Sequence, residues 1–322
     1  MSNNEWQEGK PYRTEKISRK VAGRKLEIPI CIPSYGRPDS AMFKILEKEP
    51  DLPMVFFIRE EQKELYAGLK GKARIVTLKN VDNIGQTRAK IVKWAHKQGY
   101  ENIFMFDDKV TAVNALAPRL SRNDNWSMSK FTTTMYQALQ VWEYLIRKYK
   151  PCMSGGLHKG FSFSPGNINA EPEIAPGIWC AIQLNVDMLS ENDINYRDSN
   201  IYGHEDNIME IEVMQKRLKH ICFKDIEFDN IPSSDKYTGG IQDTCPESET
   251  RLERVSRLSD LVEKFVGKGH PGIIFYTWKD GARYVRMNWK YWRKHYSEEP
   301  KLTKKQIDRF NVLKLSEVSK DE

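Results

Sequence analysis

The sequence predicts an α/β protein whose mixed, largely parallel sheet is flanked by helices. Two observations support this fold class. Strand-length apolar stretches alternate with a segment of helical periodicity over residues 26–110, and such alternation is typical of parallel sheets. In addition, the segment Gly99–Val110 contains four consecutive apolar residues that are followed at once by Asp107 and Asp108. A continuous apolar run is typical of a strand buried on both faces.

Three further strands are predicted upstream of this one. They are Leu26–Arg37, Leu52–Ile58 and Ala73–Leu78. The first runs into a Pro-Ser-Tyr-Gly-Arg-Pro loop, and the second is closed by Arg59, Glu60 and Glu61. Short apolar runs bounded by such polar or turn residues favour strands of a buried sheet.

A helix is predicted between the third of these strands and the two aspartates. Asn83–Gln86 indicates a turn and a helix start, and Thr87–Gln98 has apolar or small residues on one side of a helix. That spacing places one face against the sheet and leaves the cations mostly outside: Arg88, Lys90, Lys93 and Lys97. Gly99 then ends the helix.

Asp107 and Asp108 are the first candidate site. Open α/β sheets bind ligands at the carboxyl ends of their strands, which is where this pair is predicted to lie. Carboxylate oxygens are ligands that suit Mg²⁺ or Mn²⁺, so the pair is suited to an ion that carries a diphosphate. A helix cap or a solvated turn explains the same two residues equally well.

The second half of the chain offers two more candidates. Residues 154–166 combine glycine and serine with His158, Lys159, Phe161 and Phe163, which fits either a ligand-binding loop or an ordinary hairpin loop; the adjacent Ile178–Val186 is a predicted strand. Glu205 and Asp206 stand just before a helix-like segment, 207–217. The amides and dipole of a helix N-terminus keep a carboxylate ionised, as a catalytic base must be. A simple N-cap is the alternative.

The C-terminal region is basic and aromatic. Between Phe275 and Tyr296, eight aromatic residues are interleaved with six lysines and arginines, against one acid, Asp280. Such interleaving suits phosphate neutralisation and base stacking, and the net charge of +7 and the pI near 8.9 agree with a nucleic-acid partner. The same rings also fit the core of a small hairpin and helix, because Asp-Gly at 280–281 is a hairpin turn signal.

Composition excludes several other classes. The 322 residues contain no apolar stretch long enough to span a membrane and no N-terminal signal peptide. Five scattered cysteines without a CxxC pair indicate reduced thiols, so we expect a cytoplasmic protein. The chain lacks a Walker loop and a GxGxxG motif that follows a strand.

The order of these motifs resembles a known family. A Pro-Ser-Tyr-Gly-Arg loop, an Asn-Ile-Gly-x-x-Arg helix start and a strand ending in Asp-Asp are similar to GT-A (Rossmann-like) glycosyltransferases over roughly residues 26–230. Within that group the chain is most similar to bacteriophage enzymes that add sugars to hypermodified DNA bases. The resemblance implies a UDP-sugar donor, a 5-hydroxymethylpyrimidine in DNA as acceptor, and inversion at the sugar. If the protein is phage-encoded, we expect it to act in the cytoplasm of the infected bacterium.

The resemblance also implies roles for individual residues. The residues implied to contact the donor nucleoside lie in the Pro-Ser-Tyr-Gly-Arg loop and just after the second strand: Pro33, Ser34, Tyr35, Arg37 and Glu60 (or Glu61). Arg88 is implied to contact the diphosphate. Asp206 is implied as the base, with Glu205 beside it, and Gly203 and His204 extend that motif. The family often has Asp-x-Asp or three aspartates, whereas this chain has Lys109 in the third place. Asp108 is then the metal ligand, and Asp107 contacts the ribose or the ion. His270 is the candidate third ligand, His158 and His220 compete with it, and a metal-independent variant stays open.

These expectations divide the chain into an N-terminal extension (1–20), a glycosyltransferase domain (21–250) and a basic-aromatic segment that contacts DNA (251–322). Three alternatives remain. The same fold can act on polysaccharide or protein, or the chain can be a non-catalytic nucleic-acid-binding protein. A nucleotidyltransferase fits less well, because Pro33–Arg37 is a poor version of that class's glycine-rich phosphate loop.

Overall fold

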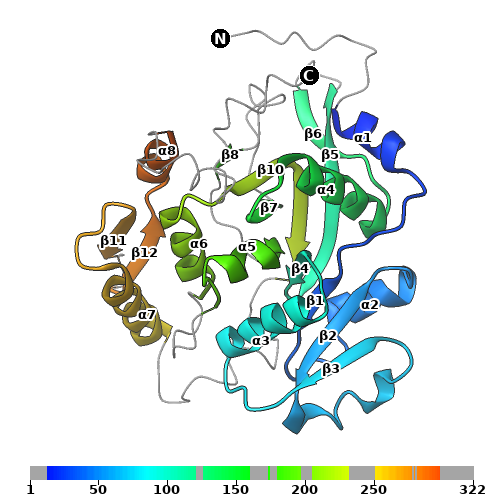
Figure 1. The fold of residues 1–322 in the computed structure, drawn as a ribbon, viewed down its shortest axis with the longest axis horizontal. Coiled ribbons are helices and arrows are strands. Elements are labelled where there is room, and N and C mark those ends of the chain that lie inside the picture. Colours follow the sequence, from blue (N-terminus) through cyan, green and yellow to red (C-terminus); the bar gives the residue numbers. More distant parts are fainter. Residues whose placement is uncertain are drawn as a thin grey trace.

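The structure is a computed structural model that describes residues 13–120, 126–159, 173–174, 180–196, 205–231, 251–277, 279 and 281–297 (Figure 1). At its centre is a ten-stranded sheet in the order β3-β2-β1-β4-β9-β7-β10-β5-β6, with β8 beside β10. A separate two-stranded sheet, β11-β12, lies in the C-terminal region.

The first half of the sheet is parallel and matches the four predicted strands. Its members are β1 (Ile30–Pro33), β2 (Met54–Arg59), β3 (Arg74–Leu78) and β4 (Asn102–Phe106). β1 is central, because it pairs in parallel with both β2 and β4. All residues of β1 and β2 are buried, as continuous apolar runs require.

The second half of the sheet mixes directions. Its members are β5 (Val110–Leu120), β6 (Trp126–Lys130), β7 (Met153–His158), β8 (Glu173–Ile174), β9 (Ala181–Asn185) and β10 (His220–Asn230). β9 pairs antiparallel with both β4 and β7, whereas β10 pairs parallel with β7 and antiparallel with β5.

Helices cover both faces of this sheet. On one face are α1 (Arg13–Val21), α2 (Ala41–Lys48) and α4 (Met135–Tyr149); on the other are α3 (Ile84–Lys97), α5 (Val186–Glu191) and part of α6 (Glu205–Gln215). Short 3-10 turns at Glu60–Gln62 and Ala67–Leu69 follow β2. Within β4, Phe104 and Phe106 pack toward Trp142 of α4, and the alternate residues Ile103 and Met105 pack toward α3. This alternation is the consequence of the strand period of two. The predicted fold class is confirmed.

The helix predicted before the aspartates is also present. Asn83 is its N-cap, and the Asn83 side chain accepts a hydrogen bond from the Gln86 amide at 2.9 Å. Gly99 has a φ of 76°, which places the chain in the left-handed region just after the helix.

The C-terminal element consists of α7 (Arg251–Val266), β11 (Ile273–Thr277), β12 (Arg283–Met287) and α8 (Trp289–Ser297). A third apolar cluster joins it to α6, with Ile208, Ile211 and Met214 on the helix and Val262 and Trp292 on the element. Because Met209 and Val213 of α6 face the main sheet, α6 lies between the sheet and this element (Figure 1). Within the described part of the chain, we find no helix with the length and apolar character needed to cross a membrane.

Candidate active site

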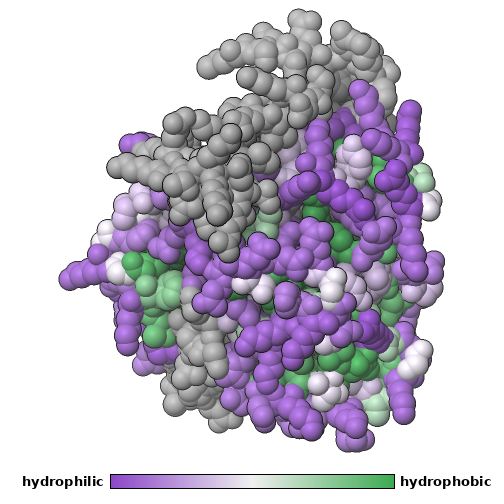
Figure 2. Space-filling model, in the orientation of Figure 1, coloured by the Kyte–Doolittle hydropathy of each residue, from purple (hydrophilic) through white to green (hydrophobic). Residues whose placement is uncertain are grey.

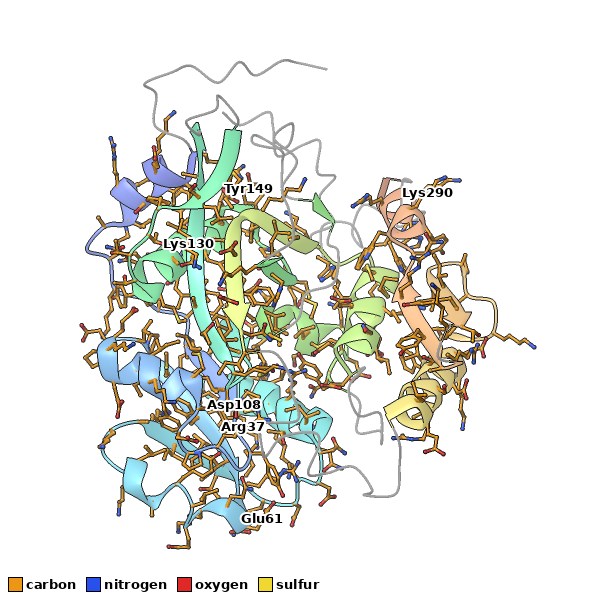
Figure 3. All side chains as sticks on the ribbon, turned by 180° about the vertical axis from the view of Figure 1, so that it is seen from behind. Arg37, Glu61, Asp108, Lys130, Tyr149 and Lys290 are labelled. Carbon is orange, nitrogen blue, oxygen red and sulfur yellow. The ribbon has the colours of Figure 1, made fainter. Side chains whose placement is uncertain are left out.

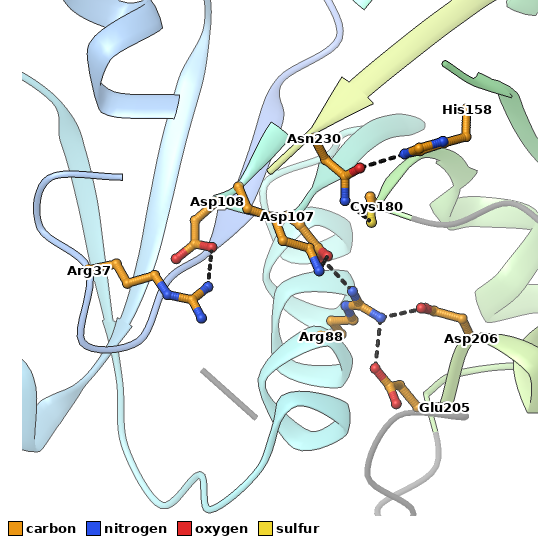
Figure 4. Close-up of polar contacts among 10 residues, drawn as sticks. Arg37, Arg88, Asp107, Asp108, His158, Cys180, Glu205, Asp206 and Asn230 are labelled. Carbon is orange, nitrogen blue, oxygen red and sulfur yellow. Dashed lines mark hydrogen bonds and ion pairs between the residues drawn. The ribbon is translucent and has the colours of Figure 1, made fainter. Parts of the chain in front are cut away.

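The predicted pair Asp107-Asp108 follows β4 directly. β4 is the strand at which the parallel half of the sheet meets its first antiparallel neighbour, β9. The Asp107 amide donates to the Cys180 carbonyl at 2.7 Å, and the Val110 amide donates to the Asp107 carbonyl at 3.1 Å. The two carboxylates point in different directions from this turn (Figure 4). The pair therefore lies where open α/β sheets place their ligand sites.

Asp108 faces the loop that follows β1. Its Oδ1 accepts from Arg37 Nη1 at 2.9 Å, and its Oδ2 accepts from the Ser34 hydroxyl at 3.0 Å. The Tyr66 hydroxyl lies 2.8 Å from Ser34 Oγ and accepts from the Arg37 amide at 3.0 Å. Burial raises the pKa of Asp108, and the Arg37 guanidinium opposes that rise. The structure thus gathers Ser34, Arg37 and Asp108, and adds Tyr66, which no sequence motif indicated.

Tyr35 and the acidic residues after β2 lie beside this loop. The Arg59 guanidinium is 4.2 Å from the centroid of the Tyr35 ring, and the Gly36 amide donates to Gln62 Oε1 at 2.8 Å. Glu60 forms an exposed ion pair with Lys79 at 3.2 Å. Glu61 lies farther from Asp108 than Arg37 does (Figure 3). Pro33 is the last residue of β1, so the predicted nucleoside contacts follow the ends of two adjacent parallel strands.

Arg88 joins Asp107 to the acidic pair at the start of α6. Its Nη2 donates to Asp107 Oδ1 at 2.7 Å, and its Nη1 donates to Glu205 Oε1 at 2.8 Å and to Asp206 Oδ1 at 2.5 Å (Figure 4). The expectation that Arg88 lies mostly outside is wrong, because the residue is only 5% exposed. Helical periodicity placed it next to the apolar face, and three carboxylates from other segments then made its burial favourable.

Burial and charge act against each other in this cluster. Burial disfavours the charge on Arg88, but Asp206, Asp107 and Glu205 together raise its pKa well above the usual value. Burial raises the pKa of Asp206, and Arg88 limits that rise. A carboxylate with a raised pKa is a stronger base than an exposed one, provided that it is ionised. The geometry therefore suits Asp206 for proton abstraction.

Further polar residues lie around the Arg88 cluster, and nothing in the sequence indicated that they belong to it. The Tyr196 ring is buried and lies 5.7 Å from the Arg88 guanidinium. On the other side, Asn230 Nδ2 donates to Cys180 Sγ at 3.3 Å, and the Cys180 carbonyl accepts from the Asp107 amide. His158 Nε2 is 2.6 Å from Asn230 Oδ1 (Figure 4). No local pattern marks Tyr196, Cys180 or Asn230, because each reaches the site from a different segment.

His270 lies at the opposite end of α6. Gln215, the last residue of that helix, is 3.5 Å from His270 Nε2, whereas Glu205 is the first. A helix of this length spans about 15 Å at roughly 1.5 Å per residue, so the structure does not bring His270 to the aspartates. His220 is buried behind α6, 3.8 Å from Glu210. Gly203, His204, Phe161 and Phe163 lie outside the described residues.

The chemistry of the aspartates fits a divalent cation. Their oxygens are the hard donors that Mg²⁺ and Mn²⁺ prefer, and the cluster around Arg88 holds three carboxylates against one guanidinium and Lys109, which is 3.8 Å from Asp107 Oδ2. Within the described ranges, no group of three or more histidine, cysteine, aspartate or glutamate side chains is placed to hold a metal. By their chemistry Asp107 and Asp108 are the candidate ligands, but their carboxylates point in different directions and are bonded to Arg88 and to Arg37 with Ser34 (Figure 4).

Comparison with known proteins gives a family match over this region. The family model described as TET-associated glycosyltransferase (TAGT) matches residues 28–231. The matched region contains the loop after β1, Arg88, both aspartates and the acidic pair of α6, and it ends before the C-terminal element. No curated protein matches the chain in sequence.

Solved structures show weaker likeness. A structure of S. aureus TarS, residues 1–349, is 9% identical, with 76% of this chain and 73% of that chain covered and a TM-score of 0.42. The complex of the same TarS fragment with UDP is 10% identical, with the same coverage and a TM-score of 0.41. GalNAc-T7 with UDP, GalNAc and Mn²⁺ is 11% identical, with 76% and 54% covered and a TM-score of 0.37. Likeness at this level assigns no function.

Proposed function

Since this chain belongs to the TET-associated glycosyltransferase family and is a glycosyltransferase, we propose that it transfers a sugar from a UDP-sugar to the hydroxyl of a 5-hydroxymethylpyrimidine in DNA, with inversion. The single observation that carries the proposal is the contact between Arg88, Asp107 and Asp206. This contact supports the proposal because it joins Asp206, the proposed base, to Asp107 at the end of β4, where we propose that the donor diphosphate binds.

The donor fits between the loop after β1 and the end of β4. Ser34, Tyr35 and Arg37 lie on that loop, with Glu60 beyond it, and they are the residues proposed to contact the nucleoside. The Arg37 side chain is 22% exposed and bonded to Asp108, so it is accessible to a ligand. Arg37 and Arg88 then lie on either side of the aspartates, where guanidinium groups are well suited to bind phosphate oxygens.

The leaving group needs charge neutralisation. When the bond between the sugar and the diphosphate breaks, its electron pair goes to the departing phosphate oxygen, and cations close to that oxygen stabilise the transition state. A Mn²⁺ or Mg²⁺ ion held by Asp107 and Asp108 would supply this stabilisation. Arg88 contributes a fixed positive charge in the same place.

Asp206 accepts the proton in this proposal. The acceptor oxygen forms a bond to the anomeric carbon from the side opposite the diphosphate, and its proton moves to Asp206. A single displacement of this kind inverts the anomeric centre. Glu205 is 5% exposed and bonded to Arg88, so we assign it the role of holding the guanidinium in position.

DNA is the acceptor that the charge of the chain favours. The formal net charge is +7, and exposed cations gather in the C-terminal element, which the next subsection describes. We propose a cytoplasmic site of action, in the infected bacterium if the protein is phage-encoded. A polysaccharide or protein acceptor is the alternative, and it predicts no affinity for DNA.

The test is a turnover screen. The protein is incubated with Mn²⁺, a panel of UDP-sugars, and duplex DNA that contains 5-hydroxymethylcytosine or 5-hydroxymethyluracil; the DNA is then digested and its nucleosides are analysed by mass spectrometry. A pentose or hexose increment that disappears with a chelator supports the proposal. UDP-sugar hydrolysis without any increment on DNA would replace the acceptor with a polysaccharide or protein. Neither increment nor hydrolysis would favour a non-catalytic binding protein.

A further inference from the structure

The β11–β12 hairpin has two chemically different faces. Its antiparallel register places Tyr276 opposite Tyr284 and Ile274 opposite Arg286 on one face, because opposed residues of such a pair point the same way. The other face carries Ile273, Phe275, Val285 and Met287, which belong to or pack against the apolar cluster with α6. We call the face of Ile274, Tyr276, Tyr284 and Arg286 the outer face of the hairpin.

Two acidic residues of α7, Asp260 and Glu263, form ion pairs with the inner face of the hairpin. Arg283, on the inner face, pairs with Glu263 at 2.8 Å and with Asp260, and its guanidinium is 4.4 Å from the centroid of the Phe275 ring. Arg283 therefore engages these two carboxylates on the side of the hairpin away from Arg286. The outer face keeps a positive charge.

On the outer face the two tyrosines stack on each other. The ring centroids of Tyr276 and Tyr284 are 5.7 Å apart with 21° between the planes, and the Arg286 guanidinium is 5.5 Å from the centroid of the Tyr276 ring. Arg286 is exposed and both tyrosines are half-buried. The side of the molecule seen in Figure 2 is largely hydrophilic, with smaller hydrophobic areas between the polar residues. The outer face therefore combines two mutually stacked tyrosine rings with one exposed guanidinium.

Helix α8 adds further exposed cations to the C-terminal element. Lys290, Arg293 and Lys294 are exposed, and Lys290 projects from α8 into solvent (Figure 3). The tryptophans of the helix are structural by contrast. Trp292 is 1% exposed, and its Nε1 donates to the Gly272 carbonyl at 2.9 Å. This contact fixes α8 to the start of the hairpin.

We infer that the outer face of the hairpin and the exposed side of α8 together bind the phosphate backbone of duplex DNA without reading its sequence. Lysine, arginine and tyrosine side chains donate hydrogen bonds to phosphate oxygens, and such contacts position a protein on DNA without specifying a base. The facing sides of the two tyrosine rings are already in contact, so no base is inserted between them. The inference deepens the proposed function, since it names the surface that holds the acceptor.

The surface is connected to the candidate base by a single helix. α6 begins at Glu205 and Asp206, and its residues Ile208, Ile211 and Met214 pack against the C-terminal element. The element therefore packs along α6, and the candidate base lies in the first turn of that helix. Contacts to the phosphate backbone alone leave the modified base unbound by this surface.

The test compares two double variants of equal charge. Arg286→Glu/Lys290→Glu reverses two cations of the proposed surface, and Lys44→Glu/Lys48→Glu reverses two exposed lysines of α2. Binding of a fluorescent duplex is measured by anisotropy over a range of salt concentrations. The first variant is expected to bind about tenfold more weakly at low salt, and the slope of log K against log salt is expected to fall by roughly 2, one for each phosphate contact. The α2 variant is expected to change much less.

Two controls separate this inference from the proposed function. Circular dichroism melting shows whether each variant is folded, and UDP-sugar hydrolysis shows whether the donor site is intact. Weaker DNA binding of the first variant alone, with melting unchanged, supports the surface even if no sugar is transferred to DNA. Equal effects of the two variants, or no binding of DNA by the wild type, would overturn it. If the melting temperature of the first variant is lowered, the single variant Arg286→Gln is used in its place, and its DNA affinity is compared with that of the α2 variant in the same way.

Discussion

Arg88 of α3 and Asp206 of α6 are 118 positions apart in sequence, and their side chains meet at 2.5 Å. The same guanidinium contacts Asp107 at the end of β4, so one buried side chain joins the proposed donor site to the proposed base. Removing it is expected to affect stability as well as chemistry.

The first prediction concerns Arg88→Met. This change leaves three carboxylates without their shared cation in a buried place, and it is expected to lower the free energy of unfolding by about 3–5 kcal/mol. Urea denaturation measures the loss. Arg147→Met is the matched control, because Arg147 also contacts two carboxylates, Glu27 and Glu143, but its side chain is 55% exposed; its loss is expected to be about 0–1 kcal/mol. Similar losses in the two variants would contradict the account.

The second prediction concerns the pH dependence of transfer. Burial raises the pKa of Asp206 above its ordinary value of 3.8, and a base works only when ionised. We expect kcat/KM to fall about tenfold per pH unit below that raised pKa. Burial also raises the pKa of Asp108, so the profile is repeated with Asp108→Asn. The residual kcat/KM of this variant should still fall at low pH. If it does not change with pH, the decline in the wild type is caused by Asp108 and not by Asp206.

The third prediction concerns stability in acid. Burial lowers the pKa of His220 from 6.5 to about 3, so between these values the unfolded chain binds a proton that the folded chain does not. Stability contributed by neutral His220 is therefore present above pH 6.5 and is lost as the pH falls toward 3, at about 1.4 kcal/mol per unit. Melting temperatures measured from pH 7 to pH 5 should fall, and His220→Gln should show a shallower decline. An equal decline in the variant would contradict this explanation.

The fourth prediction concerns the close approach of Gly272 to Trp292. A Cβ atom on Gly272 would lie 2.4 Å from the indole ring, so Gly272→Ala must displace a buried tryptophan and is expected to cost about 1–3 kcal/mol. Gly68→Ala is the control, because a Cβ there meets no atom within 4 Å and its backbone is unstrained. Thermal melting compares the two. Equal melting temperatures would show that the contact between α8 and the hairpin is looser than described.

Local patterns in the sequence predicted the fold well. The four parallel strands and the helix before the aspartates depend on short apolar runs and helical spacing, which are visible within a dozen residues. The acidic pair at the start of α6 and the hairpin at Gly281 are equally local signals. These elements were predictable because backbone propensity and burial act over the same short range.

The partners of the charged residues were not predictable in the same way. Asp108 finds Arg37 and Tyr66, and Arg88 finds Asp206, only after distant segments fold together. A glycine-rich loop around His270 gave no information about which end of α6 it approaches. The division of the terminal aromatics into buried and outer residues depends on strand register, which the turn signal alone did not define.

The most direct test of the central claim compares the wild type with Asp206→Asn. Both proteins are given Mn²⁺, the active UDP-sugar and hydroxymethylated duplex DNA, and the nucleosides are analysed by mass spectrometry after digestion. The account predicts a sugar increment with the wild type and a loss of about 10²–10⁴-fold in its rate of formation with Asp206→Asn, while both proteins bind the duplex equally. Transfer by Asp206→Asn at the wild-type rate would contradict the assignment of the base, and no increment with the wild type would contradict the proposed acceptor.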